Sequence, residues 1–347
     1  YSWWHQHEML FGFSSAIIAG FLLTAVQTWT GLPSLRGASL WALVALWLLA
    51  RITLFYSAGL PLWLVAVIDL AFIPLTAWAV GRLVIKAQKW RNLIFVPVLV
   101  WLSLSNLGMY YGAATNNYAM VQHSAYLAIW LVVSLMVVLG GRVIPFFTSR
   151  GLQINVAPAP KWREALILIS ILVFNISLSV QVLGVAVPKP VLSIALGLLV
   201  VLNAHRLLQW APLQTLKTPL LWSLQLSYAF IILGMALWGI SLWTRLATDI
   251  AVHTLTIGAI LAMILSMMSR VSLGHTGRAL QVPAGFNLAM LCVFAAAIVR
   301  GIGLVLWPNF VLGSYHLSLT LSIVAMLWFA VQYAKPLGTP RPDHKPG

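Results

Sequence analysis

The sequence predicts an all-α protein built as a polytopic bundle of transmembrane helices. Of its 347 residues, 61% are hydrophobic and 7% are charged, whereas about 25% of the residues in a typical globular domain are charged. A water-soluble surface cannot be built with such a small fraction of charged residues. Most of the chain must therefore face lipid or other helices. The apolar residues also fall into runs of about 17–25 residues, the length that crosses a bilayer as a helix.

We expect eleven spans in a single transmembrane helical domain, residues 1–334, followed by a Pro-rich cytoplasmic tail, residues 335–347. The spans are 9–29, 39–56, 61–83, 92–112, 119–139, 164–184, 190–208, 219–239, 249–269, 284–306 and 311–333. Five of the connections contain turn-forming residues, namely Gly31-Leu32-Pro33, Gly59-Leu60-Pro61, Asn116-Asn117, Pro188-Lys189-Pro190 and Trp307-Pro308-Asn309. Because residue 1 is Tyr rather than Met, we expect the natural protein to begin upstream, where one more helix would return the amino terminus to the cytoplasm.

The positive charges assign the two sides of the membrane. Of the 20 Lys and Arg, Arg51 and Arg300 lie within spans, and only Lys189 and Arg245 lie in the loops of one side. All the others lie in the loops and tail of the opposite side, which the positive-inside rule places in the cytoplasm. The net charge of +15 therefore reflects orientation in the lipid bilayer, and we expect no nucleic-acid partner. The single cysteine, Cys292, excludes a disulfide framework and a covalent C-x-x-C-H haem motif.

The first thirty residues carry a cluster of potential metal ligands, His5, His7 and Glu8. In an α-helix His5 and Glu8 share one face, because they are three residues apart, while His7 points elsewhere. Carboxylate–imidazole pairs at this spacing recur in metal centres held by helix bundles. The alternative is a polar helix cap beside interfacial tryptophans, Trp3 and Trp4. A stripe of small residues follows, which would let another helix or a flat cofactor approach closely: Gly12, Ala16 and Gly20.

Five of the eight histidines fall in one outer layer of the membrane. His5 and His7 are joined there by His123, His253 and His316, each within ~10 Å of the outer end of its span. One such histidine more often satisfies a hydrogen bond, but five ionisable groups at this depth are costly and indicate function. Imidazole binds iron, copper and zinc, so this layer could supply one or two haem ligands plus a copper or non-haem iron site. Proton relay is the competing use.

Three charges are expected within the spans, Arg51, Asp69 and Arg300. An Arg51–Asp69 salt bridge would join the second span to the third, since buried charges are normally paired. Alternatively, Arg51 or Arg300 would bind haem propionates, for which arginine offers forked donors. The two interpretations can coexist.

Two Gly-containing, basic segments are expected to end helices on the cytoplasmic side. They are residues 140–148 (GGRVIPFFT) and 269–278 (SRVSLGHTGR). Both are typical positive-inside stops. Alternatively, His275, Arg278 and Arg142 would form a second site for a cofactor, a quinone or a lipid head group.

The combination of motifs resembles the NnrS family of bacterial membrane proteins. The resemblance lies in residues 4–12 (WHQHEMLFG), 19–25 (AGFLLTA), 29–31 (WTG), 140–148, 253–259 (HTLTIGA) and 270–278. It implies a haem- and copper-containing protein with twelve spans in the bacterial inner (cytoplasmic) membrane, associated with nitric oxide metabolism and protection from nitrosative stress. Residue 1 would be periplasmic and the C-terminus cytoplasmic. The chain departs from the family at Gln225-Leu226-Ser227-Tyr228, where a histidine is common.

Together these observations predict an oxidoreductase that resembles a nitric oxide reductase. Non-covalent haem b would be held by His253 and His123, with Arg51 and Arg300 as further cofactor-binding residues. Copper or non-haem iron would be held by His5, His7, Glu8 and His316, and Glu8 would pass protons during catalysis. Electrons would come from quinol or a cytochrome. The alternatives are a haem-based protein that binds or senses nitric oxide without turnover, and a transporter of a metal complex or small anion.

Overall fold

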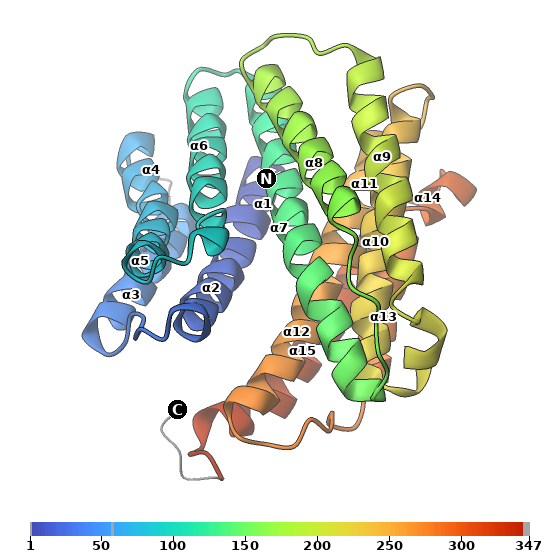
Figure 1. Ribbon diagram of the computed structural model, residues 1–347. Helices are drawn as coiled ribbons and strands as arrows, with labels where there is room; N and C mark the ends of the chain where they lie inside the picture. Colours follow the sequence, from blue (N-terminus) through green and yellow to red (C-terminus); the bar gives the residue numbers. More distant parts are fainter. Residues whose placement is uncertain (1, 57–58, 343–347) are drawn as a thin grey trace. The chain divides into compact units, whose positions relative to one another are not determined.

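The computed structural model describes residues 2–56 and 59–342, and these residues form helices and connecting loops without any strand (Figure 1). Ten helices within this part of the chain are long and apolar enough to cross a membrane. In chain order they are α1–η1–α2 (Ser2–His7, Glu8–Ser14, Ser15–Thr30), α3 (Ala38–Phe55), α4–α5 (Leu62–Leu70, Phe72–Lys86), α6 (Phe95–Ala114), α7 (Tyr118–Leu152), α8 (Lys161–Val182), α9 (Lys189–Leu208), α10 (Pro219–Ser241), α11–η5–α12 (Thr248–His253, Thr254–Leu261, Ala262–His275) and α15 (Val311–Gly338). They confirm the all-α, polytopic fold and correspond to ten of the eleven expected spans.

The expected span 284–306 is divided into two helices. Its first part, α13 (Phe286–Arg300), has 15 residues and covers ~22 Å at ~1.5 Å per residue, less than the ~30 Å of a bilayer core. The helix stops at Gly301, where an added Cβ would lie 2.6 Å from Thr254 Oγ1. A short helix, α14 (Gly303–Leu306), follows. Close packing against η5 therefore favours glycine at the position where the helix ends.

The helices do not end where the two basic segments begin, contrary to the expectation from the glycines in these segments. α7 continues through Gly140 and Gly141 to Leu152, and α12 continues to His275. An added Cβ at Gly141 would lie 2.7 Å from Cζ of Arg206, so this glycine makes room for a side chain and does not stop the helix. α15 similarly reaches Gly338, so the first residues of the expected tail are helical. His344 and Lys345 of that tail lie outside the described residues.

The third span is interrupted at Ala71, between α4 and α5. Pro74 lies in the first turn of α5 and has no N–H to donate to the carbonyl four residues earlier, which opens the helix at this point. The break follows Asp69 by two residues. It therefore separates the turn that carries this acid from the rest of the span.

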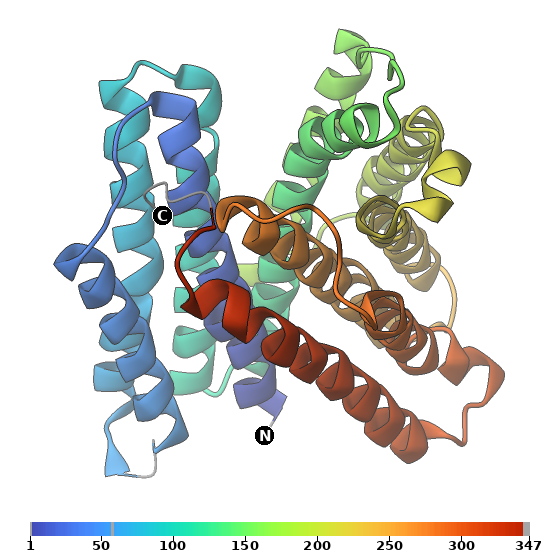
Figure 2. The same cartoon turned by 90° about the horizontal axis from the view of Figure 1, so that it is seen from below.

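The chain forms two compact units. Unit 1 comprises residues 1–135 and 175–187, and unit 2 comprises residues 136–174 and 188–347. In unit 1, α5 packs against α2 and α6, and α4 packs against α3 and α6. In unit 2, α10 is the central helix and packs against α9, η5 and α12. Figure 2 shows α12, in orange, beside α15, in red. α15 also packs against α13.

Candidate functional site

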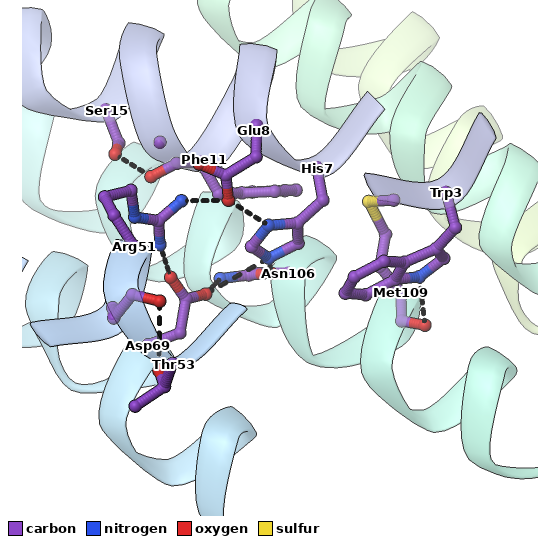
Figure 3. A network of polar contacts seen from close by, with 12 residues as sticks. Trp3, His7, Glu8, Phe11, Ser15, Arg51, Thr53, Asp69, Asn106 and Met109 are labelled. Carbon is purple, nitrogen blue, oxygen red and sulfur yellow. Dashed lines mark hydrogen bonds and ion pairs between the residues drawn. The ribbon is translucent and has the colours of Figure 1, made fainter. Parts of the chain in front are cut away.

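The most extensive polar cluster of unit 1 is an ionic network at the start of the chain (Figure 3). We call it the Arg51 network, and its members are His7, Glu8, Arg51, Asp69 and Asn106. They come from α1, η1, α3, α4 and α6, so four membrane-spanning helices contribute side chains. His7 is 0% exposed, Asn106 1% and Asp69 3%.

His7 and Glu8 lie where α1 passes into a π-helical segment, and both belong to the same network. The segment η1 begins at Glu8, and at its end the N–H of Ser15 donates to the carbonyl of Leu10, five residues earlier. A π-helical turn holds an extra residue and is frequent at functional sites. The expectation that His7 points away from Glu8 assumed a regular α-helix and is wrong. His7 Nδ1 lies 3.4 Å from Glu8 Oε1.

Both ring nitrogens of His7 face oxygen atoms that accept hydrogen bonds. Nδ1 faces the Glu8 carboxylate, while Nε2 lies 3.1 Å from Asp69 Oδ2 and 2.9 Å from Asn106 Oδ1. The amide of Asn106 is oriented by its other end, where Nδ2 donates to Asp69 Oδ2 at 2.7 Å. An imidazole satisfies acceptors on both sides only with a hydrogen on each nitrogen. The arrangement therefore calls for a positively charged His7.

Arg51 joins the two carboxylates of the network. Its Nη1 donates to Glu8 and its Nη2 to Asp69, which confirms the expected Arg51–Asp69 salt bridge between the second and third spans. An added Cβ at Gly12 would lie 2.7 Å from Arg51 Nη1, so this glycine lets the guanidinium approach η1. With His7 charged, two positive groups balance two carboxylates, as buried charges require.

Aromatic rings enclose the imidazole. The ring of Trp3 stacks on His7 with centroids 4.8 Å apart, and Tyr110 contacts it edge-on at 5.2 Å. The Nε1 of Trp3 donates to the carbonyl of Met109 at 3.3 Å. Trp3 thus packs within the site and is not simply a membrane anchor. The hydroxyl of Tyr110 is buried beside the Asp69 carboxylate.

In unit 2, two of the predicted cofactor-binding residues lie at the ends of packed helices. His253 is the last residue of α11, is half-buried and has Nδ1 2.7 Å from the carbonyl oxygen of Asp249. Arg300 ends α13, is 8% exposed and lies over the ring of Tyr315, with Cζ 4.0 Å from the centroid. No ion pair to Arg300 is present among the described residues. α13 packs against η5, which directly follows His253.

The other predicted ligands are more scattered. His5 and His316 are exposed on α1 and α15, and His123 is half-buried near the start of α7. Since His123 belongs to unit 1 and His253 to unit 2, their joint ligation of haem stays a prediction. Joint binding of a metal by His316, which belongs to unit 2, and by His5, His7 and Glu8, which belong to unit 1, also stays a prediction. Within the described ranges, no group of three His, Cys, Asp or Glu is placed to hold a metal ion.

The second predicted site contains an arginine with a structural role. Arg278 donates from Nη1 to the carbonyl of Pro336 at 3.0 Å and from Nη2 to Thr339 Oγ1 at 2.6 Å. It therefore ties the loop after α12 to the end of α15. His275 is exposed at the end of α12 and Arg142 is exposed on α7, and their grouping with Arg278 as a binding site stays a prediction.

Sequence reasoning missed several of the buried polar residues. Asn106 and Tyr110 were treated as ordinary residues of the fourth span, although an asparagine in the middle of an apolar run was a usable signal. Arg163 and Arg206 were assigned to cytoplasmic loops. They are 1% and 2% exposed in α8 and α9, where both contact Glu164.

Comparison with known proteins places this architecture in one family. Residues 1–341 match the family model described as NnrS protein. No match was found among curated proteins or solved structures. The matched range includes all five residues of the Arg51 network and both His253 and Arg300. The chain therefore belongs to the NnrS family, and this membership indicates a multi-pass membrane protein related to nitric oxide.

Proposed function

We propose that the protein reduces nitric oxide to nitrous oxide at a haem-containing site in the bacterial inner membrane. Two molecules of nitric oxide, two electrons and two protons give nitrous oxide and water. The observation that carries the proposal is a buried histidine between two carboxylates, one of which reaches the surface. The Glu8 side chain is 14% exposed and that of Asp69 is 2% exposed.

The residues of unit 2 fit a non-covalent haem. Nδ1 of His253 faces a carbonyl oxygen, so this nitrogen carries the hydrogen, and Nε2 is the nitrogen that would ligate haem iron. The buried guanidinium of Arg300 forms no salt bridge among the described residues and interacts with Asp249 only from beyond salt-bridge distance, so its forked donors suit a propionate. Haem bound there would supply a redox-active iron that binds nitric oxide.

The second metal does not fit the Arg51 network as it is arranged. Both nitrogens of His7 are directed at oxygen atoms, and the Glu8 carboxylate pairs with Arg51. We therefore assign no step to copper or non-haem iron, and we treat neither His7 nor Glu8 as a metal ligand.

Instead, these side chains provide a path for protons. The partly exposed Glu8 takes up a proton at its carboxylate, His7 carries one on each ring nitrogen, and Asp69 accepts from Nε2. Asn106 fixes the positions of the Asp69 and His7 side chains, because it forms a hydrogen bond with each of them. Positioned acid–base groups of this kind accelerate reactions by about 10²–10⁴-fold. The electrons would come from quinol or a partner cytochrome, and the charge asymmetry supports a periplasmic position for Glu8.

The test is anaerobic nitric oxide consumption by the purified protein with an electron donor, combined with its absorption spectrum. We expect His253→Ala to lose the haem spectrum. Glu8→Gln should keep that spectrum and lower turnover about a hundredfold, whereas Gln27→Ala, an exposed amide on α2, should behave as wild type.

Each outcome separates the proposed function from its alternatives. Absence of turnover at full haem loading would contradict the enzymatic proposal, and nitric oxide binding in single-turnover spectra would then favour a sensor. Absence of haem after reconstitution would contradict the cofactor assignment itself and favour a transporter.

A further inference from the structure

A second buried ionic cluster lies in unit 2, and we call it the Arg206 network. Its members are Arg163, Glu164, Asn203, Arg206 and Tyr228. Arg163 and Glu164 lie in the first turn of α8, and Arg206 lies in the last turn of α9. With 22 residues, α8 is ~33 Å long and matches the ~30 Å bilayer core, so its first turn lies near the head groups.

Arg206 is fully occupied within this network. Its Nε and Nη2 donate to the two oxygens of Glu164, and its Nη1 lies 2.9 Å from Tyr228 Oη and 3.0 Å from the carbonyl oxygen of Val137. A forked pair of this kind neutralises both partners. Arg206 and Glu164 thus form a closed unit.

Arg163 is left with an unbalanced charge. Its only carboxylate contact among the described residues is Glu164 Oε1, 3.4 Å from its Nε, which it shares with Arg206. Its Nη1 donates to Gln209 Oε1 at 2.5 Å and lies 3.4 Å from His205 Nδ1. Its Nη2 has no hydrogen-bond partner in the described part of the chain. A guanidinium that is 1% exposed needs a counter-charge.

We propose that Arg163 binds the phosphate of an anionic membrane lipid. Guanidinium groups bind phosphate with two parallel hydrogen bonds, and basic pockets at the membrane boundary hold anionic head groups. The surrounding surface suits a lipid. Trp162, next to Arg163 in α8, is 58% exposed, as expected at an interface, while Leu208 at the end of α9 and Leu213 in the following segment, residues 212–217, are 72% and 81% exposed. Exposed Lys161 adds positive charge. The proposal does not depend on the proposed reaction.

The experiment measures lipid binding to the delipidated full chain by native mass spectrometry and by its thermal midpoint. The probes are phosphatidylglycerol, phosphatidylcholine and inorganic phosphate. We expect phosphatidylglycerol to remain bound and to raise the midpoint, and phosphatidylcholine and phosphate to do so at least tenfold less effectively. Arg163→Gln should weaken phosphatidylglycerol binding at least tenfold, while Arg91→Gln, an exposed arginine between α5 and α6, should leave it unchanged.

A second variant covers the case in which Arg163→Gln fails to fold. Arg163→Lys keeps the charge and loses the forked geometry, so it should fold and still bind phosphatidylglycerol several-fold more weakly than wild type. Equal binding by wild type and whichever Arg163 variant folds would overturn the proposal. An equal loss in Arg91→Gln would do the same, because it would indicate unspecific surface charge. An equal effect of inorganic phosphate would identify a free-anion site and would also refute a lipid site.

Discussion

The Arg51 and Arg206 networks place an arginine in the same way but differ in net charge. In each, an arginine lies against a neighbouring helix at a glycine, since an added Cβ at Gly12 or Gly141 would come within 2.7 Å of the guanidinium of Arg51 or Arg206. In each, that arginine bonds to a glutamate near the start of a membrane-spanning helix, Glu8 or Glu164. The glycine and the glutamate therefore fix the position of the guanidinium, while the other members of each network set its net charge.

The other members differ. The Arg51 network adds a second acid, Asp69, and a histidine, so its charges balance when both nitrogens of His7 carry hydrogen. The Arg206 network adds a second base, Arg163, and leaves a positive charge without an equivalent acid among the described residues. The first arrangement is suited to holding a proton and the second to holding an anion.

The largest expected difference concerns removal of the two arginines. Arg51→Gln leaves buried Asp69 and Glu8 to share one cation, His7, among the described residues, and should lower the free energy of unfolding by about 3–5 kcal/mol. Arg206→Gln should cost less, about 2 kcal/mol, because Glu164 is 32% exposed and keeps Arg163 as a partner. Chemical denaturation in detergent measures both, with exposed Arg245→Gln as the control. Equal losses would mean that burial of the remaining acid does not decide the cost.

The glycines should rank in the opposite order. Gly141→Ala displaces an arginine that is 2% exposed and fully bonded, and should cost about 2–3 kcal/mol. Gly12→Ala displaces Arg51, whose side chain is 14% exposed and can shift, and should cost about 1 kcal/mol. The same denaturation curves measure this. A double variant, Gly141→Ala with Arg206→Gln, should lose less than the sum of the single losses, and strict additivity would refute the contact.

Asn106 tests the coupling within the Arg51 network. Asn106→Leu removes the amide that bonds to both His7 and Asp69, while the direct contact of 3.1 Å between them remains. We expect a loss of about 1–2 kcal/mol in unfolding free energy. Exposed Asn309→Leu serves as the matched control. A loss no greater than in this control would show that Asn106 does not stabilise the pair.

The smallest expected effect separates two glycines of the same predicted stripe. An added Cβ at Gly20 meets nothing within 4 Å, so Gly20→Ala should raise the unfolding free energy by about 0.5–1 kcal/mol through reduced backbone entropy. A loss of stability would mean that Gly20 makes room for a neighbour other than the described residues, whereas Gly12 makes room for Arg51. The thermal midpoints of Gly20→Ala and Gly12→Ala, each compared with wild type in one detergent, measure this difference.

The spans and the Arg51–Asp69 pair could be predicted because both follow from local rules. Apolar run length sets the spans, and two opposite charges on consecutive spans have few other partners. The contact of His7 with Glu8, at the start of η1, could not be predicted from residue counting, because Asp69 and Arg51, which belong to other helices, bind these two side chains. A second π-helical segment, η5, directly follows His253 and also has a glycine five residues after the histidine. That spacing is a signal that could have indicated both segments.

The sequence alone determined the fold class, the spans and the side on which most positive charge lies, because the energy of placing apolar and charged groups in a bilayer depends on the chain residue by residue. Only the tertiary structure decided which polar groups meet. Gly140 and Gly141 could mark a helix end or a close approach, and Arg163 and Arg206 could lie in a loop or in the protein interior. Those choices depend on the neighbouring helices, whose side chains come from distant parts of the sequence.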